Sequence, residues 1–130
     1  MKKILVVEDS RDKKDQLINF LSKKNIEFEI CECLNDALRY LYENSKNISG
    51  IILDLGLERE KSDPDYDQYM GLELAEEAER IKLNIPILIN STTEVEMIST
   101  YSSVYGHRTE MDDYDTLENF ISFLSERKEQ

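Results

Sequence analysis

Short apolar runs alternate with segments of helical periodicity along most of this chain. Residues 3–8 (KILVVE), 48–54 (ISGIILD) and 86–91 (PILINS) have the composition of strands that are buried on both faces of a parallel sheet. Residues 26–31 (IEFEIC) alternate between apolar and acidic side chains, which is typical of a strand nearer a sheet edge. A fifth strand is expected near residues 102–107 (SSVYGH).

Amphipathic helices are expected between these strands. One helix runs to about Lys24, a second begins at residue 34, and a third covers residues 71–82. The last helix carries a stripe of apolar residues at i, i+3, i+4 and i+7, formed by Leu117, Phe120, Ile121 and Leu124. Strands and helices in this order predict an α/β fold, doubly wound in three layers around a five-stranded parallel sheet.

Two stretches carry weaker signals. Residues 57–70 (LEREKSDPDYDQYM) are polar, contain Pro64, and read as a long loop. Residues 93–114 are expected to hold a short helix before the fifth strand and the last helix. The length of 130 residues, without a repeat or a low-complexity tract, predicts one domain over residues 1–130 with no output domain.

Charge and cysteine content restrict the classes of function. The chain has 28 acidic and 16 basic residues, and its net charge of -12 argues against direct binding to nucleic acid or to an anionic membrane. The apolar runs are too short for a membrane span or a signal peptide. Cys31 and Cys33 are two residues apart, so in a strand they point to opposite faces and are expected to be reduced thiols. We therefore expect a cytoplasmic protein.

Acidic and hydroxyl residues stand where three of the predicted strands end. Glu8 and Asp9 follow the first strand, Asp54 ends the third, and Ser91 ends the fourth. Ligands of doubly wound folds bind at this carboxyl edge of the sheet. Three carboxylates repel one another unless a cation lies between them, and oxygen ligands without His or Cys suit Mg²⁺. A carboxylate beside Mg²⁺ can act as a nucleophile toward phosphorus and form an acyl phosphate.

Four motifs together resemble the receiver domain of bacterial two-component response regulators. They are VVEDS at the first strand, ILDLGL at the third, GLEL at the start of the third helix, and PILINST at the fourth strand. The resemblance extends from Lys2 to about Leu124 and implies a flavodoxin-like (βα)5 fold. It also implies a signalling protein rather than a metabolic enzyme. Such a protein accepts a phosphoryl group from a histidine kinase or a phosphotransfer protein, with Mg²⁺, and signals to a downstream protein through a conformational switch.

The resemblance assigns roles to the acids of the first and third strands. Asp54 matches the phosphorylated aspartate of receivers. Asp9 matches the direct Mg²⁺ ligand, and Glu8 matches the acid that holds a metal-bound water. Gly56 matches the residue whose backbone carbonyl binds the metal. The receiver catalyses only its own phosphorylation and dephosphorylation.

The resemblance also assigns roles to residues of the predicted fourth and fifth strands. Ser91 matches the switch hydroxyl, with Thr92 as its substitute if the register shifts by one residue. Tyr105 matches the aromatic residue that rotates in receiver switching.

The chain departs from the receiver pattern in its second half. Receivers end the fifth strand with a lysine, usually followed by proline, that pairs with the phosphoryl group, but no lysine occurs here between Lys82 and Lys128. Arg108 is a candidate substitute, and His107 is another, although Arg differs from Lys in shape and reach. The segment between the fourth strand and the last helix is short, which leaves the usual signalling face undefined.

The loop after the third strand departs from the pattern as well. Glu58 stands where receivers commonly have proline, and residues 59–68 (REKSDPDYDQ) have the character of an insertion beside the site. Together with the missing lysine, this favours an alternative hypothesis, a pseudo-receiver that binds a partner without being phosphorylated. A hydrolase with an aspartate nucleophile is disfavoured, because its acid two residues past the nucleophile is replaced by Gly56.

Overall fold

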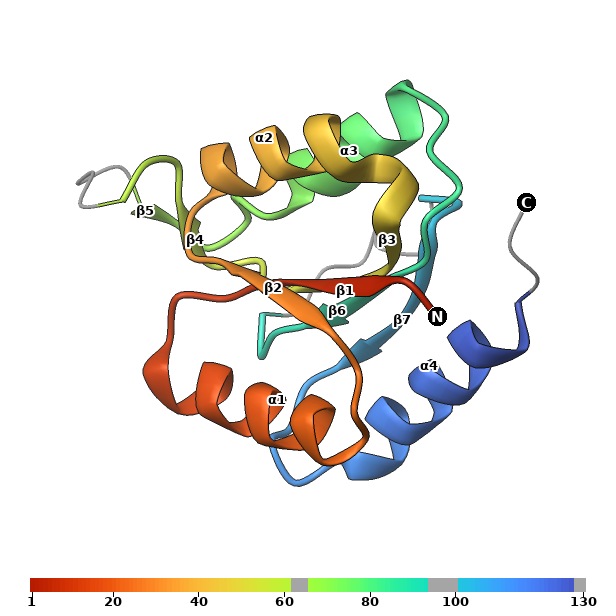
Figure 1. Cartoon of the computed structure of the whole chain (residues 1–130). Helices are drawn as coiled ribbons and strands as arrows, with labels where there is room; N and C mark the ends of the chain where they lie inside the picture. Colours follow the sequence, from red (N-terminus) through yellow and green to blue (C-terminus); the bar gives the residue numbers. More distant parts are fainter. Residues whose placement is uncertain (62–65, 94–100, 128–130) are drawn as a thin grey trace.

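The computed structural model describes residues 1–61, 66–93 and 101–127, which form a central sheet between two layers of helices (Figure 1). In chain order, the elements are β1 (Lys3–Val7), α1 (Arg11–Lys23), β2 (Phe28–Cys31), α2 (Leu34–Asn44), the 3-10 helix η1 (Ser45–Asn47), β3 (Ile48–Leu53), β4 (Leu57–Glu58), β5 (Tyr66–Asp67), α3 (Leu72–Arg80), β6 (Ile87–Asn90), β7 (Val104–Arg108) and α4 (Tyr114–Glu126).

The main sheet has five parallel strands in the order β2-β1-β3-β6-β7. Helices α1 and α4 lie on one face of this sheet, and α2 and α3 lie on the other (Figure 1). The predicted doubly wound α/β fold is confirmed, and the strand order is that of the flavodoxin-like type. The short helix expected between residues 93 and 114 falls largely on residues 94–100, outside the described residues. No helix in the described ranges is long and apolar enough to cross a membrane.

Strand β1, which lies between β2 and β3, shows why the apolar runs are uninterrupted. Successive side chains of a strand point to opposite faces. Ile4 and Val6 pack into the core under α1 and α4, whereas Leu5 and Val7 pack into the core under α2 and α3. All four side chains are fully buried, so each β1 position from Ile4 to Val7 needs an apolar residue.

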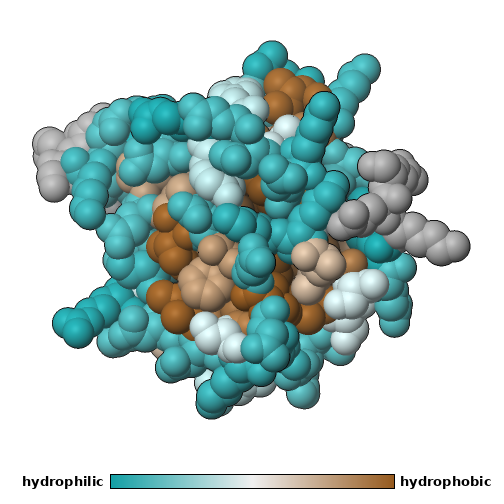
Figure 2. Space-filling view, viewed as in Figure 1, coloured by the Kyte–Doolittle hydropathy of each residue, from teal (hydrophilic) through white to brown (hydrophobic). Residues whose placement is uncertain are grey.

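Strand β2 lies at an edge of the sheet, as its alternating sequence predicts. Hydrophobic residues gather near the middle of the face shown in Figure 2, where β2 lies in Figure 1. Ile26, Phe28 and Ile30, on or next to β2, are partly buried and pack against the core under α1 and α4. Glu27 and Glu29 alternate with them, and acidic side chains on an edge strand oppose pairing with another chain.

Cys31 is the last residue of β2 and Cys33 is the N-cap of α2, and both are buried and free. Burial is the main cause that raises the pKa of the Cys31 thiol to about 12. This thiol is therefore protonated at neutral pH and a poor nucleophile or metal ligand. Their state agrees with the expectation of two reduced thiols.

The loop prediction for residues 57–70 was wrong in part. Strands β4 and β5 form a two-stranded antiparallel sheet in which Leu57 pairs with Asp67 and Glu58 pairs with Tyr66. Two-residue strands are too short to give a periodic pattern, so the sequence carries no signal for them. The residues inserted after β3 thus begin and end on a paired backbone beside the carboxyl edge of the main sheet.

Gly71 returns the chain from this insertion to the main body. Its backbone N–H donates a hydrogen bond of 2.8 Å to the carbonyl of Leu55. A Cβ atom at Gly71 would lie 2.2 Å from the carbonyl oxygen of Asp54 and 2.9 Å from the Cα of Leu55. Since both neighbours are backbone atoms, only glycine fits where α3 begins. Gly71 therefore fixes the backbone that presents the Asp54 carboxylate.

We expect Gly71→Ala to lower the free energy of unfolding by about 1–3 kcal/mol, the usual cost of an added methyl group in a packed site. Gly106→Ala is the matched control, because a Cβ atom there would have no neighbour within 4 Å. We expect the control to change stability by at most about 0.5 kcal/mol. Urea unfolding followed by circular dichroism measures both variants. Equal stability of the two variants would contradict the close approach at Gly71.

Candidate functional site

Glu8, Asp9 and Asp54 meet at the carboxyl edge of the main sheet. The register of β1 and β3 pairs Val7 with Leu53, so the residues that follow both strands lie side by side. The Asp54 N–H donates a hydrogen bond of 2.9 Å to the Val7 carbonyl, which fixes this alignment. The three residues each offer one carboxylate oxygen, and these atoms all lie within 4.8 Å of one another. The structure thus brings the three predicted acids together.

The Glu8 carboxylate has the least favourable surroundings for a negative charge among the three. Glu8 is 1% exposed, and burial together with the nearby Asp54 raises its pKa to about 8. Its Oε2 accepts a hydrogen bond of 3.2 Å from the Ser10 N–H, but its buried Oε1 has no hydrogen-bond partner among the described residues. Burial and Asp54 also raise the pKa of Asp9. Simultaneous ionisation of the three acids is therefore unfavourable unless a further cation lies beside them.

These residues fit a divalent cation. Carboxylate oxygens without a His or Cys ligand are the donors that Mg²⁺ prefers. The Oε1 of Glu8, which accepts no hydrogen bond within the described part of the chain, is an acceptor that a cation or its bound water would satisfy. Gly56 is buried two residues beyond Asp54, and its N–H lies 3.4 Å from the Asp54 Oδ1. A role for the Gly56 carbonyl as a metal ligand stays a prediction.

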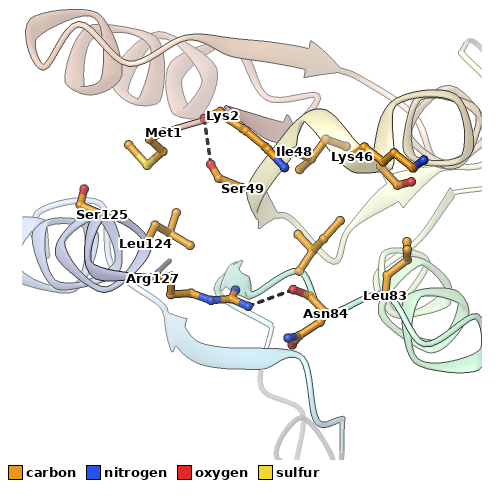
Figure 3. A pocket seen from close by; sticks show the side chains of 12 residues that line it. Met1, Lys2, Lys46, Ile48, Ser49, Leu83, Asn84, Leu124, Ser125 and Arg127 are labelled. Carbon is orange, nitrogen blue, oxygen red and sulfur yellow. Dashed lines mark hydrogen bonds between the residues drawn. The ribbon is translucent and has the colours of Figure 1, made fainter. Parts of the chain in front are cut away.

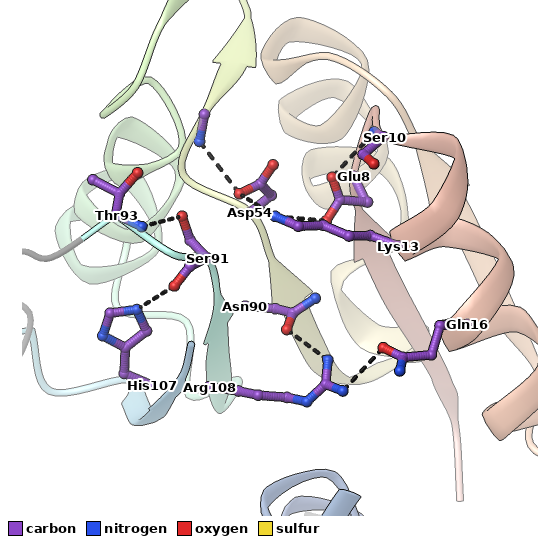
Figure 4. A network of polar contacts seen from close by, with 11 residues as sticks. Glu8, Ser10, Lys13, Gln16, Asp54, Asn90, Ser91, Thr93, His107 and Arg108 are labelled. Carbon is purple, nitrogen blue, oxygen red and sulfur yellow. Dashed lines mark hydrogen bonds and ion pairs between the residues drawn. The ribbon is translucent and has the colours of Figure 1, made fainter. Parts of the chain in front are cut away.

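Lys13 also reaches the acidic cluster, and the sequence reasoning missed it. Its Nζ lies 3.7 Å from the Asp54 Oδ1 and 4.0 Å from the Glu8 Oε1 (Figure 4). Helix α1 begins at Arg11, so Lys13 is on its first turn, and side chains of a helix point back toward its N-terminus. A lysine four residues after Asp9, on the first turn of the predicted helix, was the available signal.

Ser91 lies directly after β6, next to the strand that carries Asp54 (Figure 4). Its side chain is buried, and its Oγ accepts a hydrogen bond of 3.2 Å from the Thr93 N–H. The His107 Nε2 lies 2.8 Å from the Ser91 carbonyl oxygen. Thr92 is exposed. The geometry therefore favours Ser91 over Thr92 for the predicted switch hydroxyl.

Arg108 has partners other than the predicted phosphoryl site. Its guanidinium is 1% exposed and donates hydrogen bonds to the Asn90 and Gln16 side chains, at 2.9 Å each, and to the carbonyls of Met111 and Asp113, at 2.5 and 2.8 Å. Burial lowers its pKa from the ordinary arginine value. These bonds link the edge of the sheet to α1 and to the turn before α4. Service as the lysine substitute would require Arg108 to break them.

Tyr105 lies on the face of β7 that meets α4. Its ring centroid is 5.2 Å from that of Phe120 and 4.9 Å from that of Phe123. The Tyr105 side chain is partly exposed, at 38%. Its predicted role as a switch aromatic stays a prediction, since the structure shows one packing arrangement of this ring.

A cavity of about 1100 Å³ lies at the opposite end of the sheet (Figure 3). It is bordered by Lys2 and Ile48 near the starts of β1 and β3, by Asn84, and by Leu124 and Arg127 at the end of α4. Its described lining includes no carboxylate. Although this cavity is large, its lining within the described residues lacks the carboxylates needed for the chemistry expected at the acidic edge.

Comparisons with solved structures identify the fold. The response regulator TrrA from Thermotoga maritima, solved with Mg²⁺ and BeF, is 24% identical, with a TM-score of 0.74 over 95% of this chain and 99% of that chain. The Mn²⁺-bound response regulator Rcp1 is 26% identical, with a TM-score of 0.70 over 100% and 99%. A structure of the histidine kinase ThkA in complex with TrrA matches at 22% identity, with a TM-score of 0.72 over 95% and 98%. No protein-family model and no curated protein sequence matches the chain.

These matches span nearly the whole chain, and each is a response regulator or a complex that contains one. The resemblance that the VVEDS, ILDLGL, GLEL and PILINST motifs indicate is confirmed, and the chain has the receiver-domain fold.

The raised pKa of Glu8 predicts a pH dependence of stability. Between about pH 4.5 and about pH 8, the folded protein keeps a proton on Glu8 that the unfolded chain has released. Without divalent cations, the free energy of unfolding should therefore fall as the pH rises through this window. Glu8→Gln should flatten this fall, whereas Glu27→Gln, which removes an exposed carboxylate, should leave it unchanged. Urea unfolding in a chelator from pH 4.5 to pH 9 tests this, and parallel curves for wild type and Glu8→Gln would refute it.

Proposed function

We propose that this chain is a phosphoacceptor receiver, in which Asp54 takes a phosphoryl group from a histidine kinase or a phosphotransfer protein in a Mg²⁺-dependent reaction. The observation that carries the proposal is the acidic cluster. Glu8, Asp9 and Asp54 each place one carboxylate oxygen within 4.8 Å of the others, and the buried Oε1 of Glu8 has no hydrogen-bond partner in the described ranges. Two of the matching structures contain a divalent metal, and another is a complex with a histidine kinase, which agrees with both parts of the proposal.

Asp9 and Asp54 would hold the metal directly, with the Gly56 carbonyl, and Glu8 would accept from a metal-bound water. The metal supplies positive charge that offsets the negative charge of the phosphoryl oxygens and of the attacking carboxylate. A carboxylate oxygen of Asp54 forms the new O–P bond with one of its electron pairs. The P–N bond of the phosphohistidine donor breaks, and its electron pair returns to the leaving ring nitrogen.

Ser91 is suited to sense the product. Its Oγ accepts a hydrogen bond from the Thr93 N–H, so the hydroxyl proton is left to donate to a phosphoryl oxygen. Ser91 is also linked through its carbonyl to His107 on β7. Added negative charge beside Asp54 would thus bias the β6 and β7 edge between two states, which a downstream partner distinguishes.

A pseudo-receiver remains the second candidate, because one observation favours it. Lys13 already lies within ion-pair distance of both Glu8 and Asp54, so the buried acids have a cation from the protein itself. A protein module with this arrangement could keep its acids without a metal. Such a module would bind its partner with a surface that phosphorylation does not change.

Incubation with acetyl phosphate and Mg²⁺, followed by intact-protein mass spectrometry, separates the two candidates. We expect one added phosphoryl group per chain in the wild type. Asp54→Asn keeps the shape of the side chain but removes its nucleophilic oxygen, so it should abolish the adduct, as should a chelator. Asp9→Asn should slow labelling by about tenfold or more, the equivalent of about 1.4 kcal/mol of lost metal binding.

The control is Asp15→Asn, which removes an exposed carboxylate on α1 that belongs to no candidate metal-binding group among the described residues. It should label at the wild-type rate. A folded wild-type protein that gains no phosphoryl group and binds no Mg²⁺ would exclude the phosphoacceptor function and leave the pseudo-receiver.

A further inference from the structure

We propose that Lys13 supplies the positive charge that pairs with the phosphoryl group on Asp54. The receiver pattern has a lysine for this charge at the end of the fifth strand, which in this chain is β7 and ends on Arg108. Here it comes from the first turn of α1, on the side of Glu8. The proposal rests on the proposed phosphoacceptor function and names a further catalytic residue for it.

The position of Lys13 is the first argument. Its Nζ lies 3.7 Å from the Asp54 Oδ1 and 4.0 Å from the Glu8 Oε1, and the side chain is only 23% exposed. Figure 4 shows its stem running from α1 across the carboxyl edge toward both acids. The neighbouring Lys14 instead pairs with Glu32. The direction of Lys13 is thus specific to this residue rather than a general property of the basic helix start.

The second argument is that the other two candidate cations, Arg108 and His107, already have hydrogen-bond partners elsewhere. Arg108 is buried and donates to the side chains of Asn90 and Gln16 and to two backbone carbonyls. The His107 Nε2 contacts the Ser91 carbonyl. In the described residues, the ion pairs of Asp54 and Glu8 are both made with Lys13.

The charge balance is the third argument. A phosphoryl group adds about −1.5 to −2 charges at neutral pH. Once Asp54 has become an acyl phosphate, the phosphoryl group and the Asp9 carboxylate together carry more negative charge than one divalent cation neutralises, even while Glu8 keeps its proton. A further positive charge is needed at a depth where water screens weakly, and Lys13 is already there.

Lys13 contributes positive charge and hydrogen bonds to the reaction and forms no covalent bond. With acetyl phosphate as donor, an electron pair of an Asp54 carboxylate oxygen forms the O–P bond. The P–O bond to the acetyl group breaks, and acetate leaves with its electron pair. The Lys13 ammonium keeps its protons throughout and donates hydrogen bonds to the phosphoryl oxygens as their charge grows.

The position of Lys13 beside Glu8 and Asp54 should affect the binding of Mg²⁺ and of a phosphoryl group in opposite directions. Before phosphorylation, Lys13 competes with a divalent cation for the Glu8 and Asp54 oxygens, so its removal should raise the affinity for Mg²⁺ alone. After phosphorylation, Lys13 is a partner, so its removal should weaken binding of a phosphoryl group. A side chain that only supports the fold would change both affinities in the same direction.

The test compares Lys13→Ala and Lys13→Arg with the control Lys14→Ala. Isothermal titration calorimetry measures the affinity for Mg²⁺ alone. Fluorine NMR measures the affinity for beryllofluoride, a phosphoryl mimic, in saturating Mg²⁺, and mass spectrometry measures the labelling rate with acetyl phosphate. For Lys13→Ala, we expect tighter Mg²⁺ binding together with a loss of about ten- to a hundredfold in beryllofluoride affinity and labelling rate, typical of one charged hydrogen bond. Lys13→Arg should recover part of the loss, and Lys14→Ala should match the wild type.

Three results would overturn the inference, and they separate it from the proposed function. Wild-type labelling and beryllofluoride affinity in Lys13→Ala would exclude Lys13 and leave Asp54 as the phosphoacceptor. A parallel loss of Mg²⁺ and beryllofluoride affinity would make Lys13 a structural residue. A wild-type protein that neither labels nor binds beryllofluoride would remove the phosphoacceptor function and this inference together.

Discussion

Repulsion among the carboxylates of Glu8, Asp9 and Asp54 is the constraint on which the functional edge of this protein depends. Parallel strands β1 and β3 end side by side, so the acids that follow them lie close together despite their electrostatic repulsion. Burial raises the pKa of Glu8 to about 8, and no hydrogen bond in the described residues satisfies its Oε1. A cation relieves this cost, and Lys13 provides part of that relief from within the chain.

The rest of the fold holds this unfavourable arrangement in place. Gly71 lets the start of α3 contact the backbone at Asp54, where a larger residue would collide. Arg108 ties the end of β7 to α1 and to the turn before α4 through three hydrogen bonds, and a fourth goes to Asn90 on β6. Because α1 carries both Gln16 and Lys13, the Arg108 network also anchors the helix that directs Lys13 toward Asp54.

Most of the fold and the acidic cluster could be predicted from the sequence, because both follow from local patterns. Apolar runs define the strands, and the parallel sheet brings their last residues together. The β4–β5 pairing could not be predicted, since two-residue strands have no period. The partners of Arg108 and the direction of Lys13 depend on contacts between distant segments, and a missing lysine in the last strand gives no sign of where its replacement lies.

Crystals soaked in Mn²⁺ and examined by anomalous scattering test the central claim most directly, because the signal locates a divalent cation without any assay of activity. The account predicts one strong peak in contact with carboxylate oxygens of Asp9 and Asp54, with Glu8 directed toward it. Absence of a peak at saturating Mn²⁺, with Lys13 still paired to Glu8 and Asp54, would contradict it. That result would show that the acidic edge is balanced by the protein alone.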